Sequence, residues 1–129
     1  MAKLIAFINR YLGMKNMGDV DQYASQCVRL IEKWLTTNGK PLIWSNAADL
    51  LMMASRGDYH VTMNTPTNYP PAGAIVVWNS TWGEGYGHTA VAVAANLHYL
   101  TVFEQNDPAG ALPLVATHDY DGVAGWITW

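Results

Sequence analysis

The sequence predicts an α+β fold in which helices come first and an antiparallel sheet follows. Apolar residues recur at helical spacing over roughly the first 55 residues, whereas short apolar runs separated by turn residues fill the remainder. Helices that precede strands, instead of alternating with them, are typical of α+β proteins. A chain of 129 residues can build one core and is too short for two, so we expect a single domain over residues 1–129.

Composition and charge narrow the classes of function. Half of the residues are hydrophobic and 13% are charged, which indicates a globular chain. Up to Arg56 there are seven basic and four acidic residues, giving +3, and six acidic residues follow, giving −6, which together make the net −3. No clustered basic face results, so neither a nucleic acid nor a membrane surface is expected as a partner.

The N-terminal segment bears on localisation. Residues 1–8 resemble the start of a signal peptide, but Asn9 and Arg10 interrupt the apolar run and no small-residue cleavage site follows. We therefore expect a helix over residues 3–12 and synthesis in the cytoplasm without a signal peptide. No apolar run approaches the length of a membrane span.

The only cysteine lies on a strongly amphipathic helix that is expected to run to about Thr37, with Ser25 or Asp21 as its N-cap. Its buried face is marked by residues at helical spacing: Tyr23, Cys27, Leu30, Ile31 and Trp34. A thiol near a helix N-terminus feels the positive end of the helix dipole, which favours the nucleophilic thiolate. A packed core thiol is the alternative, since free cysteine is among the most buried residue types.

The remaining elements follow from local patterns. A third helix is expected over residues 45–54, with Ser45 as its N-cap and Gly57 after its end. A loop rich in proline at 65–71 and a loop with glycine and tryptophan at 79–87 separate strands. Six strands are expected in the antiparallel sheet: 59–64, 74–78, 88–95, 99–105, 112–117 and 123–128.

The turn between the two central predicted strands specifies a register. A turn centred on Leu97 gives antiparallel partners whose numbers sum to 194, so His88 would lie opposite Asn106 and diagonal to Glu104. Alanines share this face with His88, and we expect the Cys27 helix to pack on them. Thiol, imidazole and an orienting acceptor would then converge, as nucleophilic cysteine catalysis requires. A slip of one residue would separate His88 from Glu104.

Simpler interpretations of the polar residues stay open at this point. His88 could be an ordinary residue at the start of a strand, although an inward carboxylate at Glu104 needs a partner. For the other histidines the sequence indicates no polar partner of this kind. We expect His98 in a turn, and His60 and His118 at the surface. A zinc site is disfavoured, because the sequence has neither a Cys-x-x-Cys nor a His-x-x-x-His spacing.

Five short segments occur in a distinctive order: Gln26–Leu30, Asn46–Ala47, Gly73–Trp78, Gly87–Ala92 and Glu104–Asn106. In order and spacing they resemble the landmarks of CHAP domains, the cysteine, histidine-dependent amidohydrolases/peptidases. The closing segment Gly122–Trp126 resembles the last strand of that family, so the resemblance covers the whole chain. It implies a papain-like fold, with N-terminal helices packed on a six-stranded antiparallel sheet, and cleavage of amide bonds in peptidoglycan, as by phage endolysins.

The resemblance also implies a role for each matching residue. Cys27 matches the nucleophile and His88 the general base. Glu104 matches the acidic orienter of the histidine, and Asn106 matches a further polar residue that supports it. Gln26 matches the residue before the nucleophile, a position that suits an oxyanion hole beside the Cys27 main-chain N–H.

Aromatic side chains are expected to wall the substrate groove, because amphipathic rings suit contact with a glycopeptide. The candidates are Tyr23, Trp44, Trp78, Trp82 and Tyr86. Trp44 and Trp78 would suit the core equally well, so the sequence leaves their placement open.

Some relatives bind calcium in the loop before the cysteine. Asp19, Asp21 and Tyr23 resemble that site, but Gln22 replaces a glycine and Arg29 stands where calcium-binding relatives have an acid. Arg29 would repel a cation. The expectation is therefore that no cofactor is required, with calcium as the alternative.

These observations predict a peptidoglycan hydrolase, an amidase or endopeptidase that acts on the cell wall after release from the host cytoplasm. The expected partner is bacterial peptidoglycan, a separate cell-wall-binding chain is a second candidate partner, and the protein is otherwise expected to be a monomer. Two alternatives stay open. One is an amidase toxin or an amidase on a substrate outside the wall. The other is a non-catalytic wall-binding or phage structural module, against which the intact Cys27, His88 and Glu104 set argues.

Overall fold

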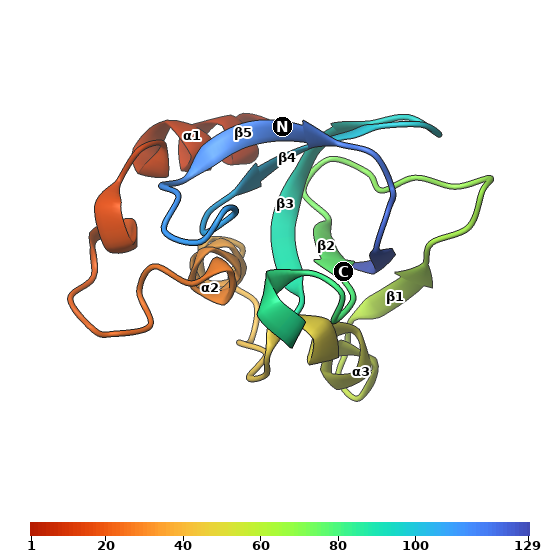
Figure 1. Ribbon diagram of the computed structural model, residues 1–129, viewed down its shortest axis with the longest axis horizontal. Coiled ribbons are helices and arrows are strands. Elements are labelled where there is room, and N and C mark those ends of the chain that lie inside the picture. The colour runs from red at the N-terminus through yellow and green to blue at the C-terminus, as the bar shows by residue number, and fades with distance from the viewer.

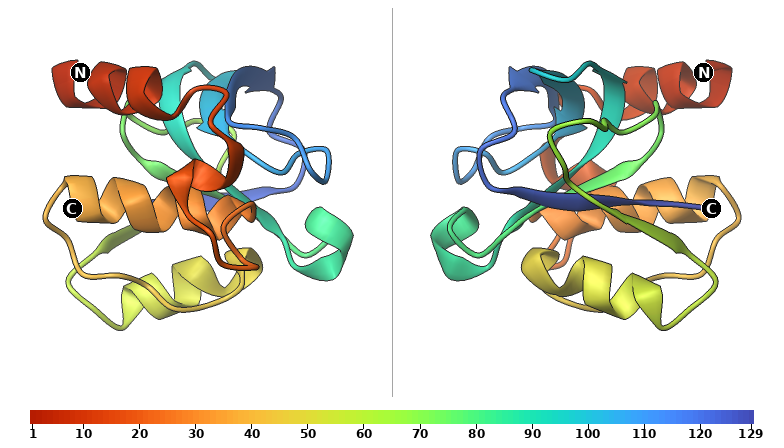
Figure 2. Two further views of the ribbon diagram at one scale, coloured as in Figure 1. Left: turned by 90° about the vertical axis from the view of Figure 1, so that its left-hand side faces the viewer. Right: turned by 90° about the vertical axis from the view of Figure 1, so that its right-hand side faces the viewer.

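Three α-helices lie on one side of a six-stranded sheet in the computed structural model, which describes residues 1–129 (Figure 1). The helices are α1 (Ala2–Tyr11), α2 (Cys27–Thr37) and α3 (Leu50–Ser55). Figure 2 shows them one above another on the same side of the molecule. Three short 3-10 turns accompany them: Lys15–Gly18, Ala47–Asp49 and Gly83–Gly85. None of the helices combines the length and apolar character that crossing a membrane would require.

The sheet is antiparallel throughout, with the strand order β1-β6-β2-β3-β4-β5. Its strands are β1 (His60–Met63), β2 (Ile75–Trp78), β3 (His88–Ala95), β4 (Leu100–Glu104), β5 (Leu114–His118) and β6 (Val123–Thr128). Helices followed by six antiparallel strands confirm the predicted α+β class. The strand β3 lies inside the sheet between β2 and β4, which buries its first residues.

The register of the β3–β4 hairpin agrees with the prediction at one end and departs from it at the other. Val91 pairs with Phe103, a sum of 194 as expected, whereas Ala95 next to the turn pairs with Leu100, a sum of 195. The difference arises from an irregularity within Ala92–Ala94, where β3 carries one extra residue. The predicted register therefore holds at Val91 and Ala92 and is wrong beside the turn.

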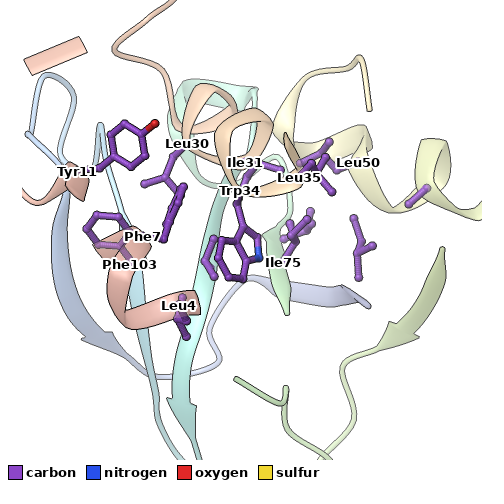
Figure 3. Close-up of a cluster of buried hydrophobic side chains, with 14 of the residues drawn as sticks. Leu4, Phe7, Tyr11, Leu30, Ile31, Trp34, Leu35, Leu50, Ile75 and Phe103 are labelled. Atoms are coloured by element: carbon purple, nitrogen blue, oxygen red, sulfur yellow. The ribbon is translucent and has the colours of Figure 1, made fainter. Parts of the chain in front are cut away.

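The main core lies between the helices and one face of the sheet (Figure 3). The contacting side chains of α1 are Leu4, Phe7 and Tyr11, and those of α2 are Leu30, Ile31, Trp34 and Leu35, all at helical spacing. The Phe7 ring lies 5.0 Å from that of Trp34 and 5.9 Å from that of Phe103. The Trp34 indole also donates to the Gly73 carbonyl at 2.9 Å, so this residue anchors α2 both by packing and by a hydrogen bond.

The helix α2 does not pack on the alanine-rich face of β3, which corrects the prediction. It contacts the opposite face, where larger side chains such as Val91 and Phe103 fill the space between helix and sheet. The alanine face belongs to a second cluster: Ala74, Val76, Trp78, Ala90, Ala92, Leu100, Val102, Val123 and Trp126. There the small alanines accommodate the indoles of Trp78 and Trp126, so their size serves packing within the sheet and not the docking of a helix.

The segment before α3 is fixed against the start of β3. The predicted N-cap does not form, because the Ser45 hydroxyl donates to the Asn46 carbonyl and the first turn, Ala47–Asp49, is a 3-10 turn. The N–H of Ala48 donates to the Tyr86 carbonyl at 2.9 Å. Gly87, at φ +82°, follows directly, and a Cβ there would lie 2.5 Å from the Ala48 nitrogen. Only glycine permits this approach, which brings two loops together beside His88.

Candidate active site

A groove of about 620 Å³ lies where the start of α2, the segment before α3, the loop before β3 and the loop after β4 meet. Six of the predicted site residues line it: Tyr23, Gln26, Cys27, Tyr86, His88 and Asn106. The structure thus brings together side chains that lie up to 83 residues apart in the sequence, between Tyr23 and Asn106. Four separate segments therefore build one open site.

The cysteine occupies the first position of α2. Cys27 is half-buried and forms no disulfide, and Gln26 before it has an extended backbone at the N-cap position. No side chain caps the helix, so the predicted caps are wrong; Asp21 accepts hydrogen bonds from Arg29 and from the Tyr23 main chain instead. An uncapped helix start presents free N–H groups and the positive end of the helix dipole to the groove. This environment suits an oxyanion, beside the exposed Gln26 side chain.

The imidazole of His88 joins the cysteine to a buried carboxylate. His88 begins β3, is 3% exposed, and its Nε2 lies 2.9 Å from Glu104 Oε1. With Nε2 engaged, Nδ1 is the nitrogen left for the thiol. Burial favours the neutral ring, but hydrogen bonds with Cys27 and Glu104 outweigh it and raise the pKa of His88 to about 9. At neutral pH the ring is therefore a cation between two acidic groups.

The carboxylate of Glu104 lies at the last position of β4 and is 1% exposed. It accepts hydrogen bonds from two histidines, His88 and His118, each at 2.9 Å. Burial raises the pKa of Glu104, but the hydrogen bonds from His118 and His88 outweigh that effect and lower it below the ordinary value. A buried carboxylate that stays ionised is the group needed to stabilise an imidazolium.

Two polar residues of this region were missed by the sequence analysis. His118 was expected at the surface, yet its side chain is 17% exposed and contacts Glu104. By alternation it shares a face with Glu104, but its strand partner is Leu100, so register alone gave no reason to expect the contact. Gln105 is 2% exposed and its amide reaches the segment before Cys27; its position between two singled-out residues was the only signal.

Two tryptophans enclose the histidines and do not wall the groove, which corrects the predicted placement of Trp82 and decides the open placement of Trp78 in favour of the core. Trp78 is fully buried, with its ring centre 5.0 Å from that of His88 and 5.5 Å from that of His118. Trp82 stacks on His88 at 6.0 Å and 21°, and meets His118 edge-on at 5.5 Å. Gly122 makes room for it, because a Cβ there would lie 2.4 Å from the Trp82 indole nitrogen. The indoles hold both imidazoles in fixed orientations.

The other three aromatic candidates are exposed but divide between two grooves. Tyr23 and Tyr86 line the Cys27 groove. Trp44 lies in a separate groove of about 440 Å³, together with Tyr59 and Trp129. Two of the five predicted groove residues therefore reach the groove that contains the cysteine.

Asn106 lines the groove but does not contact His88 as the register predicted. Its backbone has φ +64°, its side-chain oxygen accepts from the Gly110 N–H at 2.7 Å, and no hydrogen bond joins it to the imidazole. The strand pairing ends at Glu104, so the chain has already turned away at Asn106. Its side chain shapes the loop after β4.

Basic side chains form ion pairs with the carboxylates of the acidic loop before Cys27. The Arg29 guanidinium donates to Asp19 and, through two nitrogens at 2.9 Å, to Asp21, while its Nε donates to Glu32 at 3.0 Å. Lys33 donates to Asp19 at 3.1 Å. Hydrogen bonds from Arg29 hold the pKa of both aspartates below the ordinary value. Two fixed cations already pair with the carboxylates that calcium would use, so this donor set does not fit the ion.

One further group of side chains has the composition of a metal site. His88, Glu104 and Asp107 present ligand atoms within 4.8 Å of one another. The ligand atoms of His88 and Glu104 are hydrogen-bonded to each other, and His118 completes the hydrogen bonding of the carboxylate. The two imidazoles thus compensate the charge of Glu104, and we assign no metal to this group.

Comparison with known proteins places these features in a family. The family model of the CHAP domain matches residues 17–106. The chain is 33% identical to the endolysin PlyTW of Staphylococcus phage Twort, over 81% of this chain and 25% of that protein. It is 30% identical to the endolysin LysK of Staphylococcus phage K, over 89% of this chain and 25% of that protein. The chain spans about a quarter of the length of these curated relatives.

A solved structure shares the fold. The crystal structure of a wild-type endolysin, LysIME-EF1, matches with a TM-score of 0.70 over 98% of this chain and 62% of that one. Sequence identity across that match is 21%. The similarity shows that the α+β arrangement described above is that of an endolysin structure.

Proposed function

We propose that this chain, which belongs to the CHAP domain family, hydrolyses an amide bond in the peptide part of bacterial peptidoglycan. The observation that carries the proposal is the buried Glu104–His88 pair beside Cys27 at an uncapped helix start. The two staphylococcal phage endolysins among its relatives support peptidoglycan as the substrate. The geometry of the side chains supports the division of roles described below.

In the first half of the reaction the Cys27 thiolate attacks the amide carbonyl carbon. The oxyanion that forms lies at the start of α2, where the Cys27 main-chain N–H and the exposed Gln26 amide can donate to it. The His88 imidazolium then gives its proton to the departing amine, the C–N bond breaks, and a thioester to Cys27 remains.

In the second half the neutral imidazole of His88 takes a proton from water. The resulting hydroxide attacks the thioester, the C–S bond breaks, and the acid product leaves with Cys27 again a thiolate and His88 again protonated. Glu104 stabilises the imidazolium at both stages through its 2.9 Å contact with Nε2. The enclosing indoles prevent the ring from rotating away from the thiol.

The site requires neither a metal nor a second copy of the chain in this proposal. All groups with a chemical role come from one chain, and Arg29 with Lys33 supplies positive charge to the acidic loop. We therefore propose that the enzyme acts as a cofactor-free monomer. A separate cell-wall-binding chain could increase its affinity for the wall but is not needed for the chemistry.

The test is digestion of isolated cell walls by the purified chain, followed by mass spectrometry of the fragments. New amine and carboxyl ends in the peptide part are expected, and their position identifies the bond. Cys27→Ala is the control and should release nothing. Cleavage of a small amide without any release from walls would contradict the substrate and favour an amidase with another role.

A further inference from the structure

We propose that His118 is a positioning residue of this site, which fixes the Glu104 carboxylate as a charged acceptor for His88. The inference deepens the proposed function and rests on it. His118 ends β5, and nothing in the sequence pattern marked it. Its contribution emerges from contacts, burial and charge around a single carboxylate.

The contacts form a chain of three side chains. His118 Nε2 lies 2.9 Å from both oxygens of Glu104, and one of these, Oε1, is also 2.9 Å from His88 Nε2. A carboxylate held across both oxygens cannot rotate about its last bond without losing a hydrogen bond. His118 therefore sets the plane in which Oε1 meets the His88 ring.

Burial makes this second donor necessary. Glu104 is 1% exposed, and a carboxylate removed from water tends to become a neutral acid unless donors compensate it. A neutral acid would no longer stabilise an imidazolium. His118 and His88 are the compensating donors, and the hydrogen bond to Glu104 raises the pKa of His118 itself.

The charges around the carboxylate come from four elements. His88 at the start of β3 and His118 at the end of β5 contact Glu104. Asp107, in the loop after β4, lies 4.0 Å from His118 Nε2, and Cys27 at the start of α2 interacts with His88. The charge on His118 balances one of the acidic groups. Its removal disfavours ionisation of Glu104.

His118 acts through Glu104 and not on the substrate. It does not line the Cys27 groove, and Trp78 and Trp82 pack against its ring from within the fold. Its position behind the carboxylate makes it a positioning residue, whereas His88 faces the groove directly.

The experiment compares His118→Leu, which has no donor, with His118→Gln, whose amide nitrogen can replace Nε2 without its charge. We would measure the rate of Cys27 alkylation by iodoacetamide against pH, together with kcat and KM for wall fragments. For His118→Leu we expect kcat to fall about tenfold or more with KM little changed, and the acid limb of both profiles to move to higher pH. His118→Gln should keep most of kcat and show a smaller shift in the same direction.

The control is His60→Leu, which removes an exposed histidine from β1 and should leave both pH profiles unchanged. An acid limb that stays in place in both His118 variants would overturn the proposal, even if activity falls, because a purely structural loss does not move it. If His118→Leu does not fold, the pH profile of His118→Gln decides the test alone. An acid limb that stays in place in that variant would overturn the proposal. Alkylation needs no substrate, so failure of the peptidoglycan assignment would leave this test intact.

Discussion

The side-chain amide of Gln105 donates to the main-chain carbonyl of Gln26 across 2.7 Å. The same nitrogen lies 3.2 Å from the Ala24 carbonyl, and Gln105 is 2% exposed. Gln105 directly follows Glu104, and Gln26 directly precedes Cys27. One buried amide therefore ties the strand end that carries the orienting carboxylate to the helix start that carries the thiol.

We predict that Gln105→Leu lowers both stability and activity. Two carbonyls would lose their donor inside the protein, which costs about 1–3 kcal/mol of the free energy of unfolding. The helix start would also shift relative to His88, and a displacement of about 1 Å can cost on the order of a hundredfold in rate. Thermal unfolding and kcat on wall fragments measure the two effects.

The matched variant is Gln105→Glu, which keeps the shape but replaces the donor nitrogen by an oxygen. It should lose activity as Gln105→Leu does, since a carboxylate cannot donate to carbonyls. Full activity in either variant would show that the spacing of thiol and imidazole does not depend on this contact.

We predict that Cys27→Ala abolishes wall hydrolysis while the fold persists. The side chain is half-buried at the edge of the groove, so its truncation should change the free energy of unfolding by only about 1–2 kcal/mol. The measurements are loss of turbidity of a wall suspension and the thermal unfolding curve. Lysis near the wild-type rate would remove the nucleophile from the proposed mechanism.

The sequence predicted the elements of the fold better than their mutual packing. Alternation and one turn residue, Leu97, sufficed to place His88 and Glu104 on one face, and the structure has them 2.9 Å apart. The face on which α2 packs was predicted wrongly, because small residues suit either a helix or the large indoles of Trp78 and Trp126. Pattern alone does not distinguish these two uses of alanine.

Only some of the polar contacts around the site could be predicted from the sequence. Contacts between residues that face each other across paired strands follow from register. Those of His118 and Gln105 do not, since they depend on the coiling of the sheet and on where the loop before α2 is docked. The predicted contact between Asn106 and His88 failed for a related reason. The strand ends two residues before Asn106, so the alternation of side chains no longer applies there.

Hydrolysis should decline as the pH rises through the pKa of His88, about 9, because the thiolate–imidazolium pair then loses its proton. The folded-state pKa lies above the ordinary value of 6.5. The charged ring therefore contributes stability that is fully present below that ordinary value and is lost as the pH rises through the folded value. Initial rates and thermal unfolding across the alkaline range test both statements.

Replacing Glu104 should move this alkaline limb. In Glu104→Gln the acceptor no longer carries a charge, so the pKa of His88 falls and activity is lost at a lower pH than in the wild type. The rate could drop about a hundredfold if the carboxylate acts in the transition state. An unchanged alkaline limb would mean that Glu104 does not stabilise the imidazolium.

Asn106→Ala provides the contrast. Asn106 bonds Gly110 and not His88, so this variant should keep the alkaline limb of the wild type and lose activity mainly through a looser loop at the groove. The pH–rate profile and KM measure this, with an increase in KM larger than the decrease in kcat. A large fall in kcat at every pH with unchanged KM would restore Asn106 to a direct role beside the imidazole.

The last prediction concerns calcium. Arg29 and Lys33 occupy the carboxylates of Asp19 and Asp21 that would otherwise suit the ion. Wall hydrolysis should therefore be the same in EGTA and in added calcium. Arg29→Met removes the principal cation and leaves Asp19, Asp21 and Glu32 facing one another, which should lower the thermal unfolding temperature through repulsion.

In that variant the freed carboxylates offer oxygen ligands to a hard cation, so added calcium should recover part of the lost thermal stability. The wild type in the same calcium concentrations should show no change, and Lys40→Met, which removes a lysine outside the acidic loop, serves as the control for the loss of a positive charge. Complete loss of wild-type activity in EGTA, restored by calcium, would show that the ion displaces Arg29 and that the loop is a metal site after all. If added calcium stabilises Arg29→Met but not the wild type, the Arg29 guanidinium takes the place of a bound cation in this chain. Both would neutralise the carboxylates of the loop before the helix that carries Cys27.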